Sequence, residues 1–379
     1  MVQIPYRLGV IQRVLPSYRV PFFELLAQSC AGGLGLLAGQ PRPDESIETG
    51  SGLQAVLLFA ANNRHLLPGP LYLCRQEGVK PFLKEWQPDA LIVEANPRYL
   101  STPGAVSWMH RRRRPVIGWG LGAAPPRGAL AGIRGMARRG FLNQFDALVA
   151  YSRRGAEEYR QAGFPAERVF VSPNAVAPRP VKPTPDRPLD FSGGRATVLF
   201  VGRLQARKRI DLLLLACAML PETIRPQLWV VGDGPARADL EALANRILPS
   251  AQFFGARHGA ELEPLFAAAD LFALPGTGGL AVQQAMSFGL PVIVAEGDGT
   301  QSDLVRPENG WMIPPGPASP RARRPSQVRL DALTGCLAGA LADPVRLRQM
   351  GRESYRIVRE EVNLERMVEV FTGVVSLII

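Results

Sequence analysis

Short apolar runs alternate with helical patterns along the first half of the chain. The runs predict buried strands at residues 6–14, 35–37, 71–73, 90–94, 116–119, 147–151 and 168–173. Amphipathic stretches between them, the first at residues 21–28, predict helices. Strands that alternate with helices form a parallel sheet covered on both faces, and such sheets bind ligands at the carboxyl ends of their strands.

The second half repeats this alternation, and residues 267–312 combine the features of a binding site. A buried strand at 271–274 leads into a turn with Gly276, Gly278 and Gly279, and a helix is predicted at 280–288. A second buried strand, PVIVA, completes a parallel βαβ unit. The turn presents backbone N–H groups at a helix N-terminus, which favours an anion site. Alternatively, the glycines only allow a tight turn.

A proline-rich segment, PRPVKPTPDRPLD, separates the two series and predicts a domain boundary. We expect a first domain at residues 1–176, a linker at 177–195, a second domain at 196–355, and a C-terminal helix and tail at 356–379. The apolar tail, which ends in SLII, is expected to pack against the first domain. Residues 314–329 are rich in proline and arginine and predict a mobile loop.

Composition narrows the class of protein. Hydrophobic residues make up 46% of the 379, but no run of about 18 apolar residues is present, so we expect no membrane-spanning helix. The N-terminus carries arginines and no small-residue cleavage site, which predicts no signal peptide. Four distant cysteines and three histidines without ligand spacing predict free thiols, no metal site and a cytoplasmic protein.

The positive charge is concentrated in the first half. Residues 1–190 hold 24 basic and 14 acidic side chains, whereas the rest of the chain holds 20 and 19. Nine arginines and no acid lie at 98–139, including the predicted helix with Leu130, Ile133 and Met136 on one side and Arg134 and Arg138 one turn apart. Such a helix can lie on an anionic membrane, or it can be a solvated charged face. Without interleaved aromatic residues, we expect no nucleic acid partner.

Several motifs of the second half occur in the order typical of one enzyme family. They are SPNAV, FVGRLQARKRIDLLLLA, VVGDGP, FFGARHGAELEPLFAAADLFALP and AMSFGLPVIV. The chain resembles the retaining GT-B glycosyltransferases, in particular glycosyltransferase family 4. The resemblance implies an α/β fold of two Rossmann-like domains facing across a cleft, with a C-terminal helix packed on the first. It also implies a nucleotide diphosphate sugar as donor, linked to UDP or GDP, and no cofactor.

The resemblance implies that Arg203 and Lys208 contact the leaving diphosphate. Two fixed cations stabilise the negative charge that develops on the nucleotide when the sugar bond breaks, so a metal is not needed. The residues expected around the donor are Gly202, Gly232, Gly255, Thr277, Gly278, Gly279, Leu280 and Gln284.

Two departures from the family pattern concern catalysis. The family carries two glutamates at the positions of Gly276 and Gln284. The Gln284 amide can still bind ribose hydroxyls. Gly276 offers no side chain to the donor sugar, so Glu296 or Asp298 on the next loop is expected to contact it instead. A family member that has lost its catalytic activity would show the same two replacements.

The first domain lacks the histidine that the family often places near the reacting centre, since the matching strand is VIGWGLG. Glu94 is the remaining carboxylate, and we expect it to orient or deprotonate the acceptor hydroxyl, or else to pair with Arg98 or another arginine. The residues expected to contact acceptor or sugar are Tyr18, Arg19, Asn96, Arg98, Trp119, Glu296 and Asp298.

The favoured function is transfer of a sugar to an acceptor hydroxyl, with a lipid-linked or cell-surface saccharide precursor as acceptor. The enzyme would be cytoplasmic, or peripheral on the inner face of the membrane through residues 98–139. A nucleotide-sugar-binding subunit without activity is one alternative. An epimerase of the same fold is another, although GTGGL lacks the carboxylate or histidine that it would need.

Overall fold

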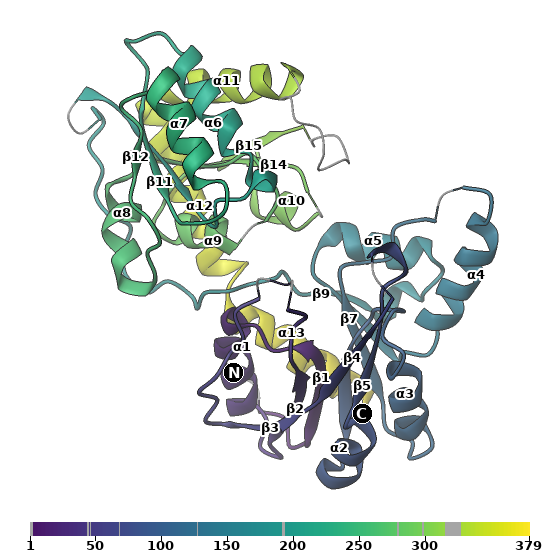
Figure 1. Cartoon of the computed structure of the whole chain (residues 1–379). Helices are drawn as coiled ribbons and strands as arrows, with labels where there is room; N and C mark the ends of the chain where they lie inside the picture. Colours follow the sequence, from purple (N-terminus) through teal and green to yellow (C-terminus); the bar gives the residue numbers. More distant parts are fainter. Residues whose placement is uncertain are drawn as a thin grey trace. The chain divides into compact units, whose positions relative to one another are not determined.

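The chain divides into two compact units. The first unit comprises Met1–Pro178 and Asn363–Ile379, and the second comprises Arg179–Val362. The computed structural model describes residues 3–43, 45, 47–67, 69–126, 128–191, 194–278, 280–297, 299–314 and 327–379 (Figure 1).

The first unit is built on a parallel sheet with the order β3-β2-β1-β6-β7-β8-β9. Its strands are β1 (Leu8–Val14), β2 (Leu34–Gly39), β3 (Val56–Ala60), β6 (Ala90–Glu94), β7 (Val116–Gly120), β8 (Ala147–Ala150) and β9 (Val169–Val171). Its helices are α1 (Val20–Gln28), α2 (Val79–Trp86), α3 (Thr102–His110), α4 (Ala131–Leu142), α5 (Arg153–Gln161) and α13 (Leu364–Ile378). The central strands are apolar along their length because helices cover both faces of a parallel sheet.

The strands of the first unit differ from the prediction in two places, at residues 71–73 and at β3. The chain there precedes β5 (Leu73–Glu77), which pairs antiparallel with β4 (Asn62–Leu66) in a separate hairpin. The edge strand β3, which the apolar pattern did not predict, pairs in parallel with β2. A short apolar run does not reveal its partner strand, because pairing depends on residues far away in sequence.

The last helix returns to the first unit, which confirms the expected packing of the C-terminal segment. Asn363 caps α13, since its side chain accepts a hydrogen bond from the backbone N–H of Arg366. Phe371 then packs on Phe22 of α1, with ring centroids 5.5 Å apart, and α13 lies beside α1 (Figure 1).

The second unit is a parallel sheet with the order β12-β11-β10-β13-β14-β15. Its strands are β10 (Thr197–Val201), β11 (Gln227–Val231), β12 (Gln252–Phe253), β13 (Leu271–Leu274), β14 (Val292–Ala295) and β15 (Gly310–Ile313). Its helices are α6 (Ile210–Met219), α7 (Arg237–Ile247), α8 (Glu263–Ala268), α9 (Leu280–Ser287), α10 (Thr300–Leu304), α11 (Gln327–Leu341) and α12 (Pro344–Glu360). Two parallel Rossmann-like sheets confirm the predicted fold class.

The proline-rich segment is bound to the second unit. The guanidinium of Arg187 donates hydrogen bonds to the backbone carbonyls of Ala269, Phe288 and Phe266. Most of the predicted loop at 314–329 lies outside the described residues. No helix in the described ranges is both long and apolar enough to span a bilayer.

Candidate functional site

The second unit has its ligand-binding edge where the strand order reverses. From β10 the chain proceeds to β11 and β12 on one side, and it then crosses to β13 on the other side. The loops that follow β10 and β13 therefore leave the sheet in opposite directions and open a crevice at their carboxyl ends. The loop after β10 carries Gly202, Arg203 and Lys208, and the loop after β13 carries residues 275–278.

Three glycines bring the ends of neighbouring strands close together. The backbone N–H of Gly202 donates to the carbonyl of Val231, and that of Gly232 donates to the carbonyl of Gly255. A Cβ on Gly232 would overlap the carbonyl oxygen of Gly202, so no larger residue fits there. No side chain therefore covers the backbone at these three glycines, which allows a phosphate to approach it closely.

Lys208 is a half-buried cation at this edge. Burial, with a smaller contribution from the neighbouring charge of Arg207, lowers the pKa of its ammonium group to about 8. Neither a hydrogen bond nor an ion pair joins the ammonium to any residue that the structure describes. A Cβ on Gly278 would overlap Nζ of Lys208, so the ammonium faces the glycine turn. An unpaired cation with a lowered pKa is a candidate for binding an anion.

Arg203 and Gln284 are also available to a ligand. Arg203 is exposed, directly after Gly202, and has no recorded partner among the described side chains. Gln284 is half-buried on the second turn of α9, whereas the preceding Gln283 is buried and donates to the carbonyl of Val362 at 2.7 Å. The two adjacent glutamines therefore differ in role, because only Gln283 is engaged in packing α9.

Gly276 is packed against main chain. A Cβ at this position would overlap the carbonyl oxygen of Arg207 and the backbone of Lys208. The next residue, Thr277, donates its backbone N–H to the same carbonyl at 3.1 Å and is otherwise exposed, like Leu280 at the start of α9. The position of the family's first glutamate therefore has no room for any side chain.

Two buried residues that sequence reasoning missed hold this turn in place. Arg329 donates to the carbonyls of Pro275 at 2.6 Å and Pro314 at 3.1 Å, and burial lowers its pKa. Gln301 donates to the carbonyl of Gly278 at 3.3 Å. No sequence signal could have identified them, because both act on backbone carbonyls distant in the chain.

Other predicted donor-side residues are placed as follows. Glu296 follows β14 and is half-buried, and its backbone N–H donates to the carbonyl of Ile313. Gly279 and Asp298 lie outside the described residues.

In the first unit, Glu94 ends β6 at the carboxyl edge of the sheet. Its carboxylate accepts a hydrogen bond from the backbone N–H of Arg13 at 2.5 Å. The guanidinium of Arg13 instead pairs with Glu45 at 2.7 Å. Burial raises the pKa of Glu94 above its ordinary value, despite the hydrogen bond and charge of Arg13. A half-buried carboxyl with a raised pKa is suited to accept a proton.

Asn96 and Arg98 lie just beyond Glu94. The side chain of Asn96 accepts a hydrogen bond from the backbone N–H of Arg98 at 3.1 Å, and the Arg98 side chain is exposed. Their proximity to Glu94 along the chain keeps them as candidates for contact with an acceptor.

The predicted contacts of Arg19 and Trp119 with an acceptor are wrong. Both side chains are buried, at 3% and 1% exposure. The guanidinium of Arg19 lies 4.5 Å from the Trp119 ring centroid, and Trp119 packs on Phe371 of α13 at 5.0 Å. Neither side chain can reach a ligand because α13, distant in sequence, covers them. Tyr18 remains partly exposed, at 36%.

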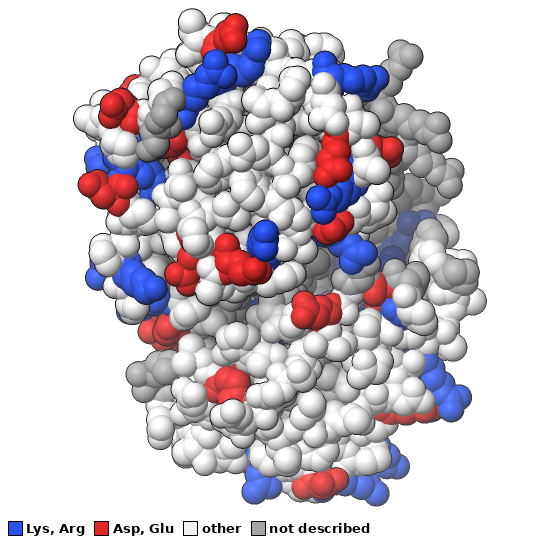
Figure 2. All heavy atoms as spheres, turned by 60° about the vertical axis from the view of Figure 1, so that its left-hand side comes forward, with Lys and Arg blue, Asp and Glu red and all other residues white. Residues whose placement is uncertain are grey.

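The arginines at 98–139 do not all lie at one edge of the sheet. Arg111–Arg114 lie between α3 and the start of β7, whereas Arg98 follows the end of β6. Parallel strands begin at one edge of a sheet and end at the other, so these groups lie at opposite edges. On the face shown in Figure 2, basic and acidic side chains are interspersed. The predicted basic helix is α4, and its N-cap residue is Leu130. Three apolar side chains there are exposed to solvent: Leu130 by 54%, Ile133 by 61% and Met136 by 70%.

Comparisons with known proteins agree with this geometry. A 38% identical GDP-mannose-dependent alpha-mannosyltransferase of Mycobacterium tuberculosis matches over 127 residues, 32% of this chain and 31% of the relative. The lipopolysaccharide core biosynthesis glycosyltransferase LpsE of Rhizobium meliloti is 27% identical and covers 60% of this chain and 70% of the relative. This chain spans 23% of the sulfoquinovosyl transferase of Arabidopsis thaliana, which is 35% identical to it over 129 residues.

Solved structures match the whole fold at low identity. Anabaena HepE in complex with UDP has a TM-score of 0.67 at 18% identity, and 97% of this chain and 99% of that chain are covered. The model of the glycosyl transferase 4-like domain matches residues 27–175. The model of glycosyl transferases group 1 matches residues 195–324. One model thus matches most of each unit, and the chain belongs to the group 1 glycosyltransferases of family 4, with the GT-B fold.

Proposed function

We propose that this chain transfers a sugar from a nucleotide diphosphate sugar to an acceptor hydroxyl, with retention of the anomeric configuration. The bond between the sugar C1 and the diphosphate oxygen breaks, and a bond from C1 to the acceptor oxygen forms. The leaving diphosphate gains negative charge, which Arg203, Lys208 and the N–H groups of the glycine turn stabilise. The acceptor proton passes to Glu94 or to the leaving phosphate.

The observation that carries this proposal is the unpaired, half-buried Lys208 with a pKa of about 8 beside the glycine turn. A charge held without a partner in a fold is unfavourable unless a ligand supplies the counter-charge. The test is calorimetric titration of UDP and GDP into the wild-type protein and Lys208→Met. Binding to the wild type that weakens in the variant supports the proposal, and equal binding contradicts it.

The names of the relatives indicate which nucleotides to test. The mycobacterial relative is named for GDP-mannose and the HepE structure holds UDP, so both bases belong in the assay. We expect Gln284 to bind the ribose, and Gly202, Gly232, Gly255, Thr277, Gly278, Gly279 and Leu280 to line the donor. Glu296 and Asp298 are expected to contact the sugar.

A catalytically impaired, nucleotide-sugar-binding subunit is the second candidate, and Gly276 is the observation that favours it. The main chain of Arg207 and Lys208 occupies the space that a glutamate side chain would need. Tight binding of a nucleotide sugar, without release of nucleoside diphosphate in the presence or absence of acceptor mixtures, would select this candidate over the enzyme.

The proposed acceptor is a lipid-linked saccharide precursor, and the proposed location is the inner face of an anionic membrane. LpsE is named for lipopolysaccharide core biosynthesis. The exposed apolar side chains on α4, with Arg134, Arg138 and Arg139 around them, match an anionic bilayer, where each basic side chain adds about 1 kcal/mol. Sedimentation with anionic and neutral vesicles at low and high salt tests this. Binding that ignores lipid charge and salt would contradict it.

A further inference from the structure

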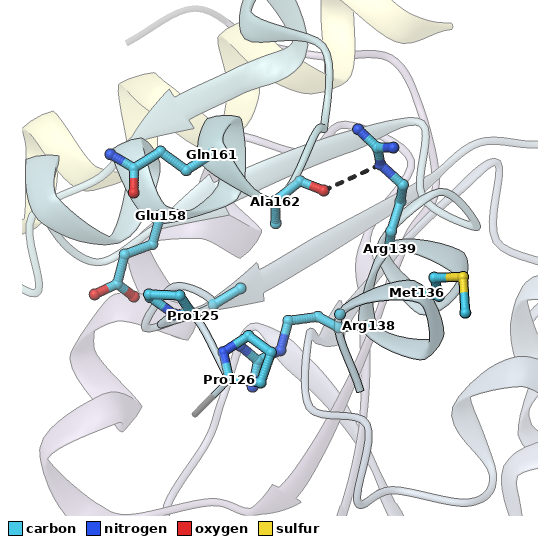
Figure 3. A pocket seen from close by; sticks show the side chains of 10 residues that line it. Pro125, Pro126, Met136, Arg138, Arg139, Glu158, Gln161 and Ala162 are labelled. Carbon is cyan, nitrogen blue, oxygen red and sulfur yellow. Dashed lines mark hydrogen bonds between the residues drawn. The ribbon is translucent and has the colours of Figure 1, made fainter. Parts of the chain in front are cut away.

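A cavity of about 310 Å³ lies in the first unit between α4 and α5 (Figure 3). The loop after β7, the inner side of α4 and the end of α5 form its walls. They contribute Ala123, Pro125, Pro126, Gly135, Met136, Arg138, Arg139, Glu158, Gln161 and Ala162. The volume is at the lower end of the range of small-molecule sites and suffices for a compact headgroup.

The cavity has two guanidinium groups in its wall. Arg138 donates to the backbone carbonyl of Ala124, and Arg139 donates through Nε to the carbonyl of Ala162 at 3.3 Å. Gly163, at φ +90°, leaves room for the Arg139 side chain. Each guanidinium has five N–H donors, and among the described residues neither group has an ion pair with a carboxylate. Several donors of each arginine thus remain for an anionic ligand.

The acid in the same wall does not neutralise these arginines. The Glu158 carboxylate lies 3.4 Å from Nε of Arg154, on its own helix. Gln161 donates to Glu157, also on α5, at 3.1 Å. The side of the cavity formed by α4 therefore keeps its positive charge, and no acidic residue occurs at all between Glu94 and Asp146.

The rim of the cavity is apolar. Met136 lines the cavity and is 70% exposed, and Pro125 and Pro126 line it as well. Ile133, three residues before Met136 on α4, is outside the lining and is 61% exposed. Two guanidinium groups beside an apolar rim match an amphiphile with an anionic head, because arginine binds phosphate in a bidentate manner and the rim contacts the attached chain.

We infer that this cavity is a binding site for a phosphate ester, with Arg138 and Arg139 as its ligands. The inference rests on the proposed membrane-bound acceptor, since an anionic phospholipid or a lipid-linked acceptor would both present this group at a bilayer. It differs from simple attraction of a basic helix to a charged surface, because it requires the space inside the cavity as well as the charge.

The experiment separates space from charge, with four variants of the full chain in two matched pairs. Gly135→Leu fills the cavity, whereas Gly132→Leu places the same side chain on α4 where a Cβ meets no atom within 4 Å. Arg138→Gln removes a cation of the cavity, whereas Arg134→Gln removes one from the same helix outside it. Leucine for glycine favours the helix, so neither leucine variant should unfold it.

The measurement is cosedimentation with phosphatidylglycerol vesicles, at one salt concentration. A site requires that Gly135→Leu and Arg138→Gln each weaken binding about tenfold or more. The control variants Gly132→Leu and Arg134→Gln should weaken it at most about fivefold, the loss expected from about 1 kcal/mol for one charge near the surface. Equal losses within each pair would overturn the inference and leave only diffuse attraction. Added glycerol phosphate distinguishes the sources. If glycerol phosphate displaces the protein from the vesicles, the site binds the soluble ester. If the protein stays on the vesicles and the variants still differ as expected, the site binds the lipid headgroup.

Titration of the same four variants with UDP and GDP tests the donor site independently of vesicle binding. Nucleotide binding belongs to the second unit and should not change in any of the four. The vesicle experiment can therefore contradict the phosphate-ester site while nucleotide binding is intact. Conversely, a chain that binds no nucleotide can still show weaker vesicle binding in Gly135→Leu and Arg138→Gln only.

Discussion

Replacing Lys208 with methionine should stabilise the nucleotide-free protein while it removes a ligand of the diphosphate. Burial lowers the pKa of Lys208 from 10.5 to about 8, a difference that corresponds to about 3 kcal/mol because one pKa unit is about 1.4 kcal/mol. The fold opposes the charged form by this amount at pH below 8. Methionine keeps the length of the side chain without its charge, so the variant escapes this penalty.

The pH dependence of the stability gain shows whether it comes from removal of the buried charge. The unfolded chain holds the Lys208 proton more tightly than the folded chain, so the free energy of unfolding of the wild type rises as pH increases from about 8 to 10.5. The advantage of Lys208→Met is therefore about 3 kcal/mol at pH 7 and less than about 1 kcal/mol at pH 10. For a domain of this size, the gain at pH 7 raises Tm by roughly 6–12 °C.

The assay is thermal unfolding without nucleotide at both pH values, together with titration of UDP and GDP at pH 7. Loss of a charged hydrogen bond to phosphate should weaken binding by about 1.5–3 kcal/mol, or roughly 10- to 150-fold. The variant should thus be more stable and bind more weakly at the same pH, as expected when a site is strained for function.

Lys182→Met is the matched control. This lysine of the second unit has an 84% exposed side chain, 3.6 Å from the carboxylate of Glu263. Its removal should change the free energy of unfolding by less than about 0.5 kcal/mol. A lower Tm for Lys208→Met, or a shift that does not depend on pH, would refute the reasoning from a buried unpaired charge.

Three further predictions concern the same site. Arg203→Ala should reduce turnover about a hundredfold or more, measured as release of nucleoside diphosphate, because it removes a donor to the developing charge. Gln284→Ala should raise the donor KM and leave turnover at saturating donor unchanged, as steady-state kinetics will show. Gly276→Glu should destabilise the protein by at least about 1–3 kcal/mol in urea unfolding and fail to raise activity, since its Cβ overlaps the carbonyl of Arg207.

Each of these has a control and a contrary outcome. Arg195→Ala removes a surface arginine 3.8 Å from Glu222 and should leave turnover unchanged. Turnover of Arg203→Ala equal to that of this control excludes a role on the diphosphate. A fall in turnover of Gln284→Ala with an unchanged KM would make that amide catalytic. A Cβ on Gly335 of α11 meets no atom within 4 Å, so Gly335→Glu should be at least as stable as the wild type. A stable, active Gly276→Glu would show that the turn can move.

The sequence predicts the elements that are buried throughout. The strands β6 and β13 occur at the predicted residues because four or more consecutive apolar side chains have no alternative to the interior of a covered sheet. The family resemblance implies that Lys208 contacts the diphosphate, and in the structure its ammonium faces Gly278 where the strand order reverses.

The parts that could not be predicted depend on contacts between distant residues. Trp119 lies near the end of β7 and carries a polar N–H, as a ligand contact would, but Phe371 covers it from a helix near the end of the chain. Gly276 stands where the family has a glutamate, and only the structure shows that a Cβ there would overlap the carbonyl of Arg207. Contacts between residues far apart in the chain leave no local pattern in the sequence.

Proton uptake on nucleotide binding tests the central claim most directly, namely that Lys208 awaits a diphosphate. At pH 8.5 most of the free protein has a neutral Lys208, since its pKa is about 8, and a bound diphosphate should restore the charge. Calorimetric titration of UDP and GDP in two buffers of different ionisation enthalpy counts the protons. We predict that the wild type takes up roughly half to three-quarters of a proton for each nucleotide bound and that Lys208→Met takes up none. Absence of binding by both nucleotides, or equal uptake by the variant, would contradict the account.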